Sequence, residues 1–300
     1  MRISTGQWYR QGVSAMLNSQ AALSKTQLQL ATGQRMLAPS DDPAAATKVL
    51  ELDQLLSSVS QYQRNSDAAE ARLMREENVL EGAGDTLQRV RELAVRASNG
   101  SLSAGDRQAI AAEVREHLDG LMGLANATDT NGEYIFGGYR TDVPAFTDDG
   151  AGNFTYQGDQ GQKLLQIGSA RHVTTGDPGD SIFMGIDDGS GGTSDVFSIV
   201  NDFITDLDSN NPSGATLTAL DNAMDQIQTV RTKIGGRMNA IENQRGINDS
   251  FALVMEQNRS ILEDLDYGEA VSQLQQQQLI LQASQQSFMK VEGLSLFNYL

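Results

Sequence analysis

The feature that most constrains the fold of this chain is a long run of positions spaced alternately by three and four residues. A 3-4 alternation sustained over many turns keeps one line of side chains facing a partner, so it is typical of a coiled-coil seam. One continuous helix over this stretch would be roughly 70 Å long at 1.5 Å per residue. The positions of this long seam are Leu220, Ala223, Ile227, Val230, Ile234, Arg237, Ile241, Gln244, Asn248, Phe251, Met255, Asn258, Leu262 and Leu265.

Some positions of the long seam carry polar side chains, namely Arg237, Gln244, Asn248 and Asn258. A polar residue at a seam position usually fixes the register of helix pairing at some cost in stability. We therefore interpret these residues as register-setting and not as catalytic.

Two further stripes predict helices that pack against this return helix. One seam covers residues 73–97 and stops at Asn99-Gly100, which is typical of a helix end. The next helix begins near Ser103, with Asp106 placed to complete a capping box. Its stripe contains Ile110, Val114, His117, Leu121 and Leu124. Together these stripes predict an antiparallel helical hairpin.

The two ends of the chain carry matching seams in which apolar residues alternate with Gln. Neither end can bury its stripe alone, and short isolated helices are marginal in water. We therefore predict that the two ends pair, gain order when subunits associate, and form the assembly interface. The predicted interface residues are Val13, Met16, Leu23 and Leu30 near the N-terminus and Val271, Leu274, Leu281 and Phe288 near the C-terminus.

The middle of the chain has a different composition, with most of the glycine together with Asp, Ser and Thr. Short β-type runs are predicted at residues 134–136, 154–156, 163–167, 171–175 and 181–186, separated by Gly and Asp turns. One helix interrupts them, with Val196, Ile199, Val200, Phe203 and Leu207 on one face. This pattern predicts a small β-rich domain of mixed α+β type.

The predicted fold is mainly α: an elongated coiled-coil rod built from both chain ends, with the β-rich domain inserted as an outward knob. The predicted divisions are an N-terminal assembly helix at 1–42 that pairs with a C-terminal assembly helix at 266–300, an outgoing half of the rod at 43–132, the outer domain at 133–214, and the return helix at 215–265.

Composition and motifs exclude several functions. The chain has no cysteine and a net charge of −17, which argues against thiolate metal sites, nucleic acid and anionic membranes. No apolar run is long enough for a membrane span, and the first twenty residues lack the apolar core of a signal peptide. His117 occupies a seam position, which favours a core or interface role over a metal ligand. His172 has no acidic or histidine partner at metal-ligand spacing, and Asp148-Asp149-Gly150 and Asp187-Asp188-Gly189 lack the further ligands of a calcium loop. We predict no catalytic, cofactor-binding or metal residues, and no enzyme activity.

Both flanks contain distinctive short motifs. They are Met1-Arg2-Ile3-Ser4-Thr5, Thr32-Gly33-Gln34-Arg35, Pro39-Ser40-Asp41-Asp42-Pro43-Ala44-Ala45, Arg91-Glu92-Leu93-Ala94 and Ile234-Gly235-Gly236-Arg237-Met238-Asn239-Ala240-Ile241-Glu242. Asp42-Pro43 within one of them is also typical of a helix start, with an N-cap residue followed by proline. Together these motifs resemble those of the flagellin superfamily of bacterial flagellar proteins.

Within that superfamily, two regions resemble the hook–filament junction proteins. One is the C-terminal ending together with a preceding acidic motif, and the other is the entry to the middle segment. The matching residues are Leu262-Glu263-Asp264-Leu265-Asp266-Tyr267, Leu294-Ser295-Leu296-Phe297-Asn298-Tyr299-Leu300, Tyr134-Ile135-Phe136-Gly137-Gly138-Tyr139-Arg140-Thr141-Asp142 and Tyr156-Gln157-Gly158-Asp159.

The resemblance implies an extracellular structural component of the flagellum that joins the hook side to the flagellin filament. Such a protein leaves the cell unfolded through the flagellar type III export channel, without a cleaved signal peptide. Its implied partners are a neighbouring hook-associated protein on the hook side, flagellin, copies of itself in a ring, and an export chaperone at the C-terminal segment. Leu296 and Phe297 in the C-terminal ending complete the predicted assembly interface.

Two alternatives remain open from the sequence. A flagellin-type filament subunit would polymerise as the filament itself, but it is expected to lack the Leu296-Phe297-Asn298-Tyr299-Leu300 ending. An unrelated cytosolic coiled-coil scaffold would not need matched Gln-rich seams at its two ends.

Overall fold

The computed structural model describes residues 5–211 and 213–297, and side chains within residues 7–211 and 213–290. The chain forms two compact units. The terminal unit comprises residues up to 58 and residues from 250 onward, and the central unit comprises residues 59–249. The helices are α1 (Thr5–Thr32), α2 (Pro43–Ala97), α3 (Ala104–Ala125), α4 (Asp180–Phe183), α5 (Val196–Asp208), α6 (Ala215–Glu263) and α7 (Tyr267–Phe297). The fold is therefore mainly α, as predicted.

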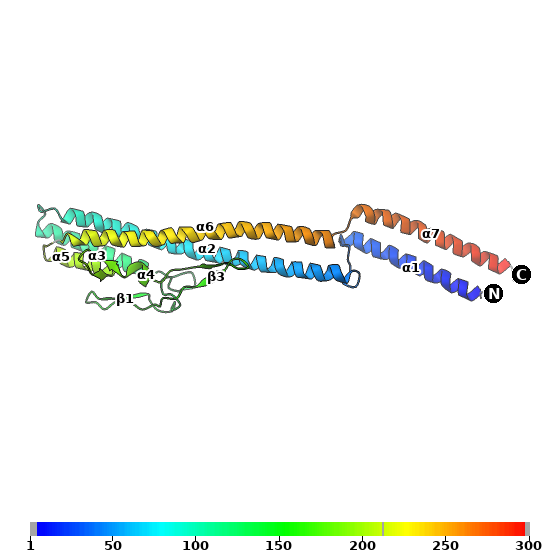
Figure 1. The fold of residues 1–300 in the computed structure, drawn as a ribbon, viewed down its shortest axis with the longest axis horizontal. Helices are drawn as coiled ribbons and strands as arrows, with labels where there is room; N and C mark the ends of the chain where they lie inside the picture. Colours follow the sequence, from blue (N-terminus) through cyan, green and yellow to red (C-terminus); the bar gives the residue numbers. More distant parts are fainter. Residues whose placement is uncertain (1–4, 212, 298–300) are drawn as a thin grey trace. The chain divides into compact units, whose positions relative to one another are not determined.

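In the terminal unit, α1 and α7 lie side by side and run in opposite directions (Figure 1). The rings of Tyr9 and Phe288 meet toward the end of the pair that carries the termini, with centroids 5.3 Å apart. At the opposite end, the hydroxyl oxygen of Tyr267 lies 2.8 Å from the position that a Cβ on Gly33 would occupy. The two chain ends are thus paired within a single chain.

Local capping explains where several helices begin and end. Oδ1 of Asp42 accepts a hydrogen bond of 3.0 Å from the Ala45 N–H, so Asp42 caps α2 ahead of proline at the first helical position. Ser103 and Asp106 form the predicted capping box at the start of α3. The end of α1 is closed by Gly33, which adopts a left-handed φ of 71° and donates to the Gln29 carbonyl at 2.8 Å.

The predicted seams are the buried faces of the helices in the central unit. His117 on α3 is only half-buried, and the neighbouring Leu118 takes the buried position of that turn. Buried seam residues are Leu73, Leu80, Ala83, Leu87, Val90, Ala94 and Ala97 on α2, Ile110, Val114 and Leu121 on α3, and Leu220, Ala223, Ile227, Val230, Ile234, Ile241 and Asn248 on α6.

Charged pairs follow the antiparallel course of α2 and α6 through the central unit. Arg245 on α6 lies 2.8 Å from both Asp67 and Glu70 on α2. Farther along, Arg231 of α6 lies 2.7 Å from Glu77 of α2. Because residue numbers rise on one helix while they fall on the other, these pairs fix the register of the two helices.

Residues 133–214, called the inserted segment below, contain short antiparallel hairpins instead of one continuous sheet. Thr147 of β1 (Phe146–Asp148) pairs with Thr155 of β2 (Phe154–Tyr156), and Leu165 of β3 (Leu164–Gln166) pairs with Val173 of β4 (His172–Thr174). The third hairpin joins β5 (Ile186–Asp187) to β6 (Thr193–Ser194).

Several details of the predicted strand pattern were wrong. Neither β1 nor β6 was predicted. Residues 134–136 form only an isolated bridge between Tyr134 and Thr128, and the run at 181–186 is largely the short helix α4, with β5 beginning only at its end. Backbone hydrogen bonds from Ile182 and Phe183 to the Gly179 carbonyl turn this apolar run into a helical turn.

One hydrophobic core joins the inserted segment to the helices of the central unit. Its aromatic part is a cluster of Phe136, Phe146, Phe183 and Phe197, with ring centroids 5.0–5.8 Å apart in the contacting pairs. The apolar face of α5, predicted from its sequence, is buried in the same core. The inserted hairpins therefore bury their apolar faces largely against helices.

Candidate assembly surface

The predicted interface residues lie mostly on the facing sides of α1 and α7. Val13, Met16, Leu23 and Leu30 on α1 and Leu274, Leu281 and Phe288 on α7 are half-buried. Val271 is 44% exposed. Leu296 and Phe297 lie beyond the residues whose side chains the structure describes. The role of all ten residues as contacts between subunits stays a prediction.

A pair of helices buries little of its surface completely. Along the described parts of α1 and α7, only Thr26 and Ala270 are buried. The hydroxyl of Thr26 donates to the Ala22 carbonyl of its own helix at 3.2 Å, which satisfies this polar group without a partner helix. The pair is therefore an open structure with apolar side chains accessible on its outer sides.

The outer sides of the terminal unit carry many exposed large apolar residues. Most of them lie off the predicted seams, but Phe251 was predicted as a seam position of α6 and is 41% exposed. Ile261 is 77% exposed, Leu50 is 72% exposed and Leu279 is 67% exposed. Where such residues gather into a patch on a soluble protein, the patch marks an interaction site. The others are Trp8, Leu17 and Leu28 on α1, Leu55 on α2, Phe251, Leu253 and Val254 on α6, and Ile280 and Met289 on α7.

The polar seam positions of the central unit hold the inserted segment. Arg237 donates two hydrogen bonds, of 2.7 and 2.9 Å, to the carboxylate of Asp177. The side-chain amide of Asn248 donates to the Ile167 carbonyl at 2.9 Å and accepts from Gln244 at 3.0 Å. These residues therefore anchor loops of the inserted segment, a role that the register-setting interpretation did not include.

A buried carboxyl group lies next to the Arg237–Asp177 pair. Glu76 on α2 has no exposed surface, and its Oε1 accepts a 2.9 Å hydrogen bond from the Asp177 N–H. Its Oε2 has no hydrogen-bond partner among the described residues. Burial raises the pKa of Glu76 to about 8, and the negative charge of Asp177 adds to this effect while the charge of Arg237 opposes it.

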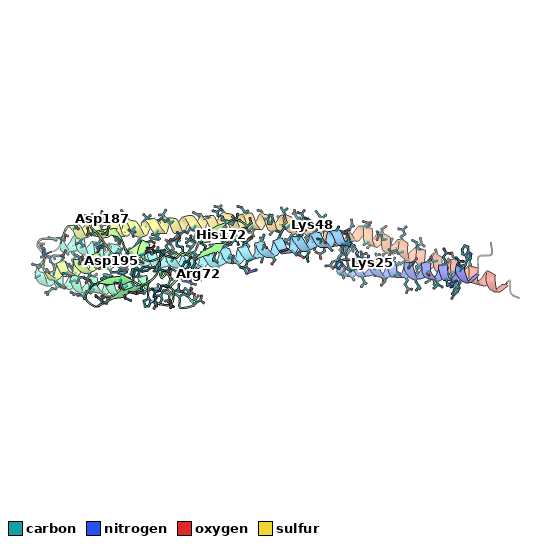
Figure 2. The ribbon with its side chains drawn as sticks, turned by 60° about the horizontal axis from the view of Figure 1, so that its bottom comes forward. Lys25, Lys48, Arg72, His172, Asp187 and Asp195 are labelled. Atoms are coloured by element: carbon teal, nitrogen blue, oxygen red, sulfur yellow. The ribbon has the colours of Figure 1, made fainter. Side chains whose placement is uncertain are left out.

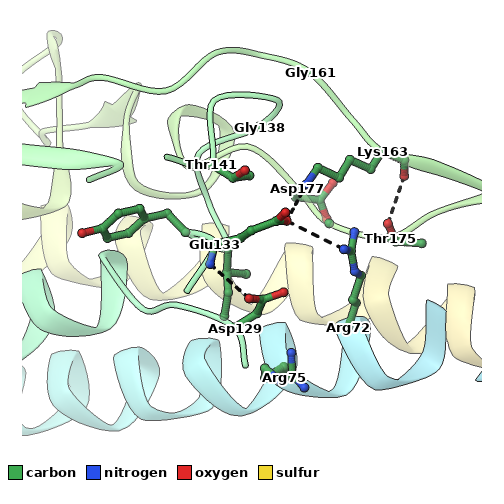
Figure 3. A pocket seen from close by; sticks show the side chains of 13 residues that line it. Arg72, Arg75, Asp129, Glu133, Gly138, Thr141, Gly161, Lys163, Thr175 and Asp177 are labelled. Carbon is green, nitrogen blue, oxygen red and sulfur yellow. Dashed lines mark hydrogen bonds and ion pairs between the residues drawn. The ribbon is translucent and has the colours of Figure 1, made fainter. Parts of the chain in front are cut away.

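A small polar cleft lies where the inserted segment meets α2 (Figure 3). Glu133 lies between Lys163, at 2.8 Å, and Arg72, at 3.8 Å. The cleft has a volume of about 50 Å³, whereas small-molecule sites usually enclose ~300–1,000 Å³. These charged groups therefore serve to join the inserted segment to α2.

The described residues show no grouping of His, Cys, Asp and Glu side chains suited to a metal ion. Within the same residues, no helix combines the length and apolar character needed to cross a lipid bilayer.

Comparison with known proteins identifies the family. Residues 3–141 match the bacterial flagellin N-terminal helical region, and residues 217–300 match the bacterial flagellin C-terminal helical region. Flagellar hook-associated protein 3 of Escherichia coli is 34% identical over 316 aligned residues, covering 99% of both chains. This chain belongs to the flagellar hook-associated protein 3 family. It is a structural component of the bacterial flagellum and not an enzyme.

Two further comparisons separate the likeness to hook-associated proteins from the likeness to flagellin. The structure of a putative flagellar hook-associated protein from Vibrio parahaemolyticus is 25% identical, covers 74% of this chain and 99% of its own, and superposes with a TM-score of 0.67. Phase 1 flagellin of Salmonella naestved is 31% identical but covers only 38% of this chain and 23% of the flagellin. The flagellin likeness is therefore partial, whereas the likeness to hook-associated protein 3 covers the whole chain.

Proposed function

We propose that this chain joins the hook side of the flagellum to the flagellin filament as a ring of identical copies. Its neighbours would be a hook-associated protein on the hook side and flagellin on the filament side. The family supports a structural place in the flagellum, and the open apolar surface of the terminal unit supports assembly through helices.

The observation that carries this proposal is the incomplete burial of the α1–α7 pair. Leu279 and Met289 on α7 point away from the facing side and are 67% and 63% exposed. Burying one such large apolar side chain contributes about 1.5–3 kcal/mol. Packing of several copies would cover these residues, so association itself supplies the driving force for assembly.

In this proposal, the ten predicted interface residues become more deeply buried when copies of the chain assemble. In a single chain the facing residues of α1 and α7 remain half-buried, and a pair of this kind has little stability of its own in water. Neighbouring copies would complete the burial of both seams. The terminal helices would then gain their full order on association, which prevents assembly before export.

Different segments of the chain would have different roles in assembly. Residues 1–42 and 266–300 would form the assembly helices, residues 43–132 and 215–265 the helical support, and residues 133–214 an outer domain. The outer domain is held to the helices by a shared core and by the Arg237–Asp177 pair.

Export of the unfolded chain through the flagellar type III channel fits its composition. The absence of cysteine means that no disulfide has to be reduced before export. A chaperone that covers the C-terminal segment would shield the exposed Leu279 and Ile280 of α7 in the cytosol. The protein would then act outside the cell without loss of a signal peptide.

Truncation tests the role of the terminal helices. Removing residues 9–30 or residues 271–288 should abolish incorporation into the flagellum. The central unit should still fold, since its core lies in residues 69–241. Normal incorporation of either truncated chain would show that the paired seams are not needed for assembly.

A further inference from the structure

The two linkers of the terminal unit are hydrogen-bonded to each other. One linker joins α1 to α2 and the other joins α6 to α7, and Gln34 and Asp264 form an antiparallel bridge between them. The N–H of Arg35 donates to the Glu263 carbonyl at 2.8 Å, and the N–H of Leu265 donates to the Gly33 carbonyl at 2.9 Å. Each linker therefore restrains the other.

The side chain of Arg35 strengthens this connection at the C-terminal end of α6. Its Nε and Nη2 both donate to the Leu262 carbonyl, at 3.1 and 2.9 Å. The last carbonyls of a helix lack partners within the helix and carry a partial negative charge, so a guanidinium group is well suited to this position. The Arg35 carbonyl in turn accepts a 2.6 Å hydrogen bond from the Gln29 side chain of α1. Arg35 thus connects α1 directly to α6.

Other contacts complete the connection on the α1 and α7 sides. Gly33 has a left-handed φ of 71°, and the Tyr267 hydroxyl occupies the space next to its Cα. Lys25 of α1, labelled in Figure 2, pairs with Asp41 of the linker at 2.6 Å. The Lys25 ammonium group lowers the pKa of Asp41, helped by the Leu37 N–H. We call the bridged segments, residues 33–35 and 262–267, the linker joint.

We propose that the linker joint stays closed during addition to the flagellum, so that α1 and α7 are presented as one body, and that Arg35 is its positioning residue. With the linkers tied together, neither terminal helix can turn away without the other. The faces that must be covered by neighbouring copies are then kept in one arrangement. The inference rests on the proposed function.

The first test replaces Arg35 with Gln in the full chain, expressed in cells that lack the native gene. The variant loses the charged group at the end of α6 but keeps the backbone bridge. We expect export at the normal level, an unchanged thermal transition of the purified chain, and several-fold fewer filaments per cell. The matched control is Arg64→Gln, because among the described residues Arg64 donates only to Ser60 and Gln61 of its own helix. It should leave the filament number unchanged.

The second test closes the joint covalently. Gln34 and Asp264 are a non-hydrogen-bonded antiparallel pair, whose Cα atoms typically lie about 4.5 Å apart. This separation suits a disulfide, and the chain has no other cysteine to interfere. The Gln34→Cys/Asp264→Cys chain, purified and added to the deletion strain, should give filaments equally well when oxidised and when reduced. With Arg35→Gln added, only the oxidised form should regain the normal filament number.

Either of two outcomes overturns the inference. One is an oxidised double-cysteine chain that fails while its reduced form assembles, since the joint would then have to open. The other is an Arg35→Gln chain that builds as many filaments as the unaltered chain. If the unaltered chain itself restores no filaments, the proposed function fails, and the result does not bear on the joint.

Discussion

The backbone N–H of Asp177 donates a 2.9 Å hydrogen bond to Glu76, a carboxyl group on α2 with no exposed surface. The Asp177 carboxylate is itself bound by Arg237 of α6. The loop that carries Asp177 therefore lies between two helices of the central unit and is held by both. Groups that face Glu76 are Asp177 from the loop, Arg237 from α6 and Glu77 from its own helix.

The raised pKa of Glu76 predicts that the central unit loses stability as the pH rises. The folded chain keeps a proton on Glu76 up to about pH 8, whereas the unfolded chain releases it near the ordinary value of 4.5. Between these values the folded state binds more protons, so the free energy of unfolding falls with pH, by at most about 1.4 kcal/mol per unit. Urea unfolding at pH 5, 6, 7 and 8 measures this decline.

Substitution isolates the contribution of Glu76. Glu76→Gln should remove most of this decline, because an amide has no proton to lose in this range. Glu92→Gln is the matched control, since Glu92 lies on the same helix, is 54% exposed and pairs with Arg89 at the surface. An unchanged decline in the Glu76→Gln chain would show that Glu76 is ionised in the folded protein.

The sequence did not predict this buried carboxyl because its partner lies 101 positions away. Periodicity identified the buried face of the helix, but it does not indicate which loop covers that face. The same limit applies to Arg237 and Asn248: their seam positions were visible, whereas their loop partners were not. Long helices were predictable because each turn repeats one signal, and the short hairpins were less so because their register depends on packing against those helices.

Arg237 should contribute more to stability than an exposed arginine of the same unit. Arg237→Ala leaves Asp177, which is only 7% exposed, without its charged partner. We expect a loss of about 2–4 kcal/mol, because a buried charge left unpaired is costly. Arg89→Ala should cost less than about 1 kcal/mol, since the pair of Arg89 with Glu113 is exposed. Equal losses in chemical unfolding would contradict this account.

Charges on the facing side of α7 should weaken assembly without destabilising the central unit. Leu281→Asp and Phe288→Asp place a carboxylate in the seam opposite α1, and Phe288 contacts Tyr9 there. Incorporation into flagella should fall sharply, while the main thermal transition of the purified chain stays unchanged. Gln286→Asp, an exposed residue of the same helix that lies about 140° around the helix from Leu281, is the control for added charge. A large fall in the main transition would show that this seam is fully packed before assembly.

The outer apolar side chains of the terminal unit should matter only in the assembled flagellum. Ile261→Gln replaces a side chain that is 77% exposed, so the free energy of unfolding should change by less than about 0.5 kcal/mol. Incorporation, measured by quantitative immunoblotting of isolated flagella, should nevertheless decrease. Gln257→Asn, at an exposed position of the same helix that lies off the seam, should have no effect on either quantity. Normal incorporation of the Ile261→Gln chain would show that Ile261 is not part of the assembly surface.

Deletion of the gene, followed by measurement of flagellin in the culture medium, tests the junction role most directly. The account predicts cells that keep their hooks, lack filaments and release flagellin as monomer, with filaments restored by a plasmid copy of the gene. Intact filaments and normal swimming in the deletion strain would contradict it.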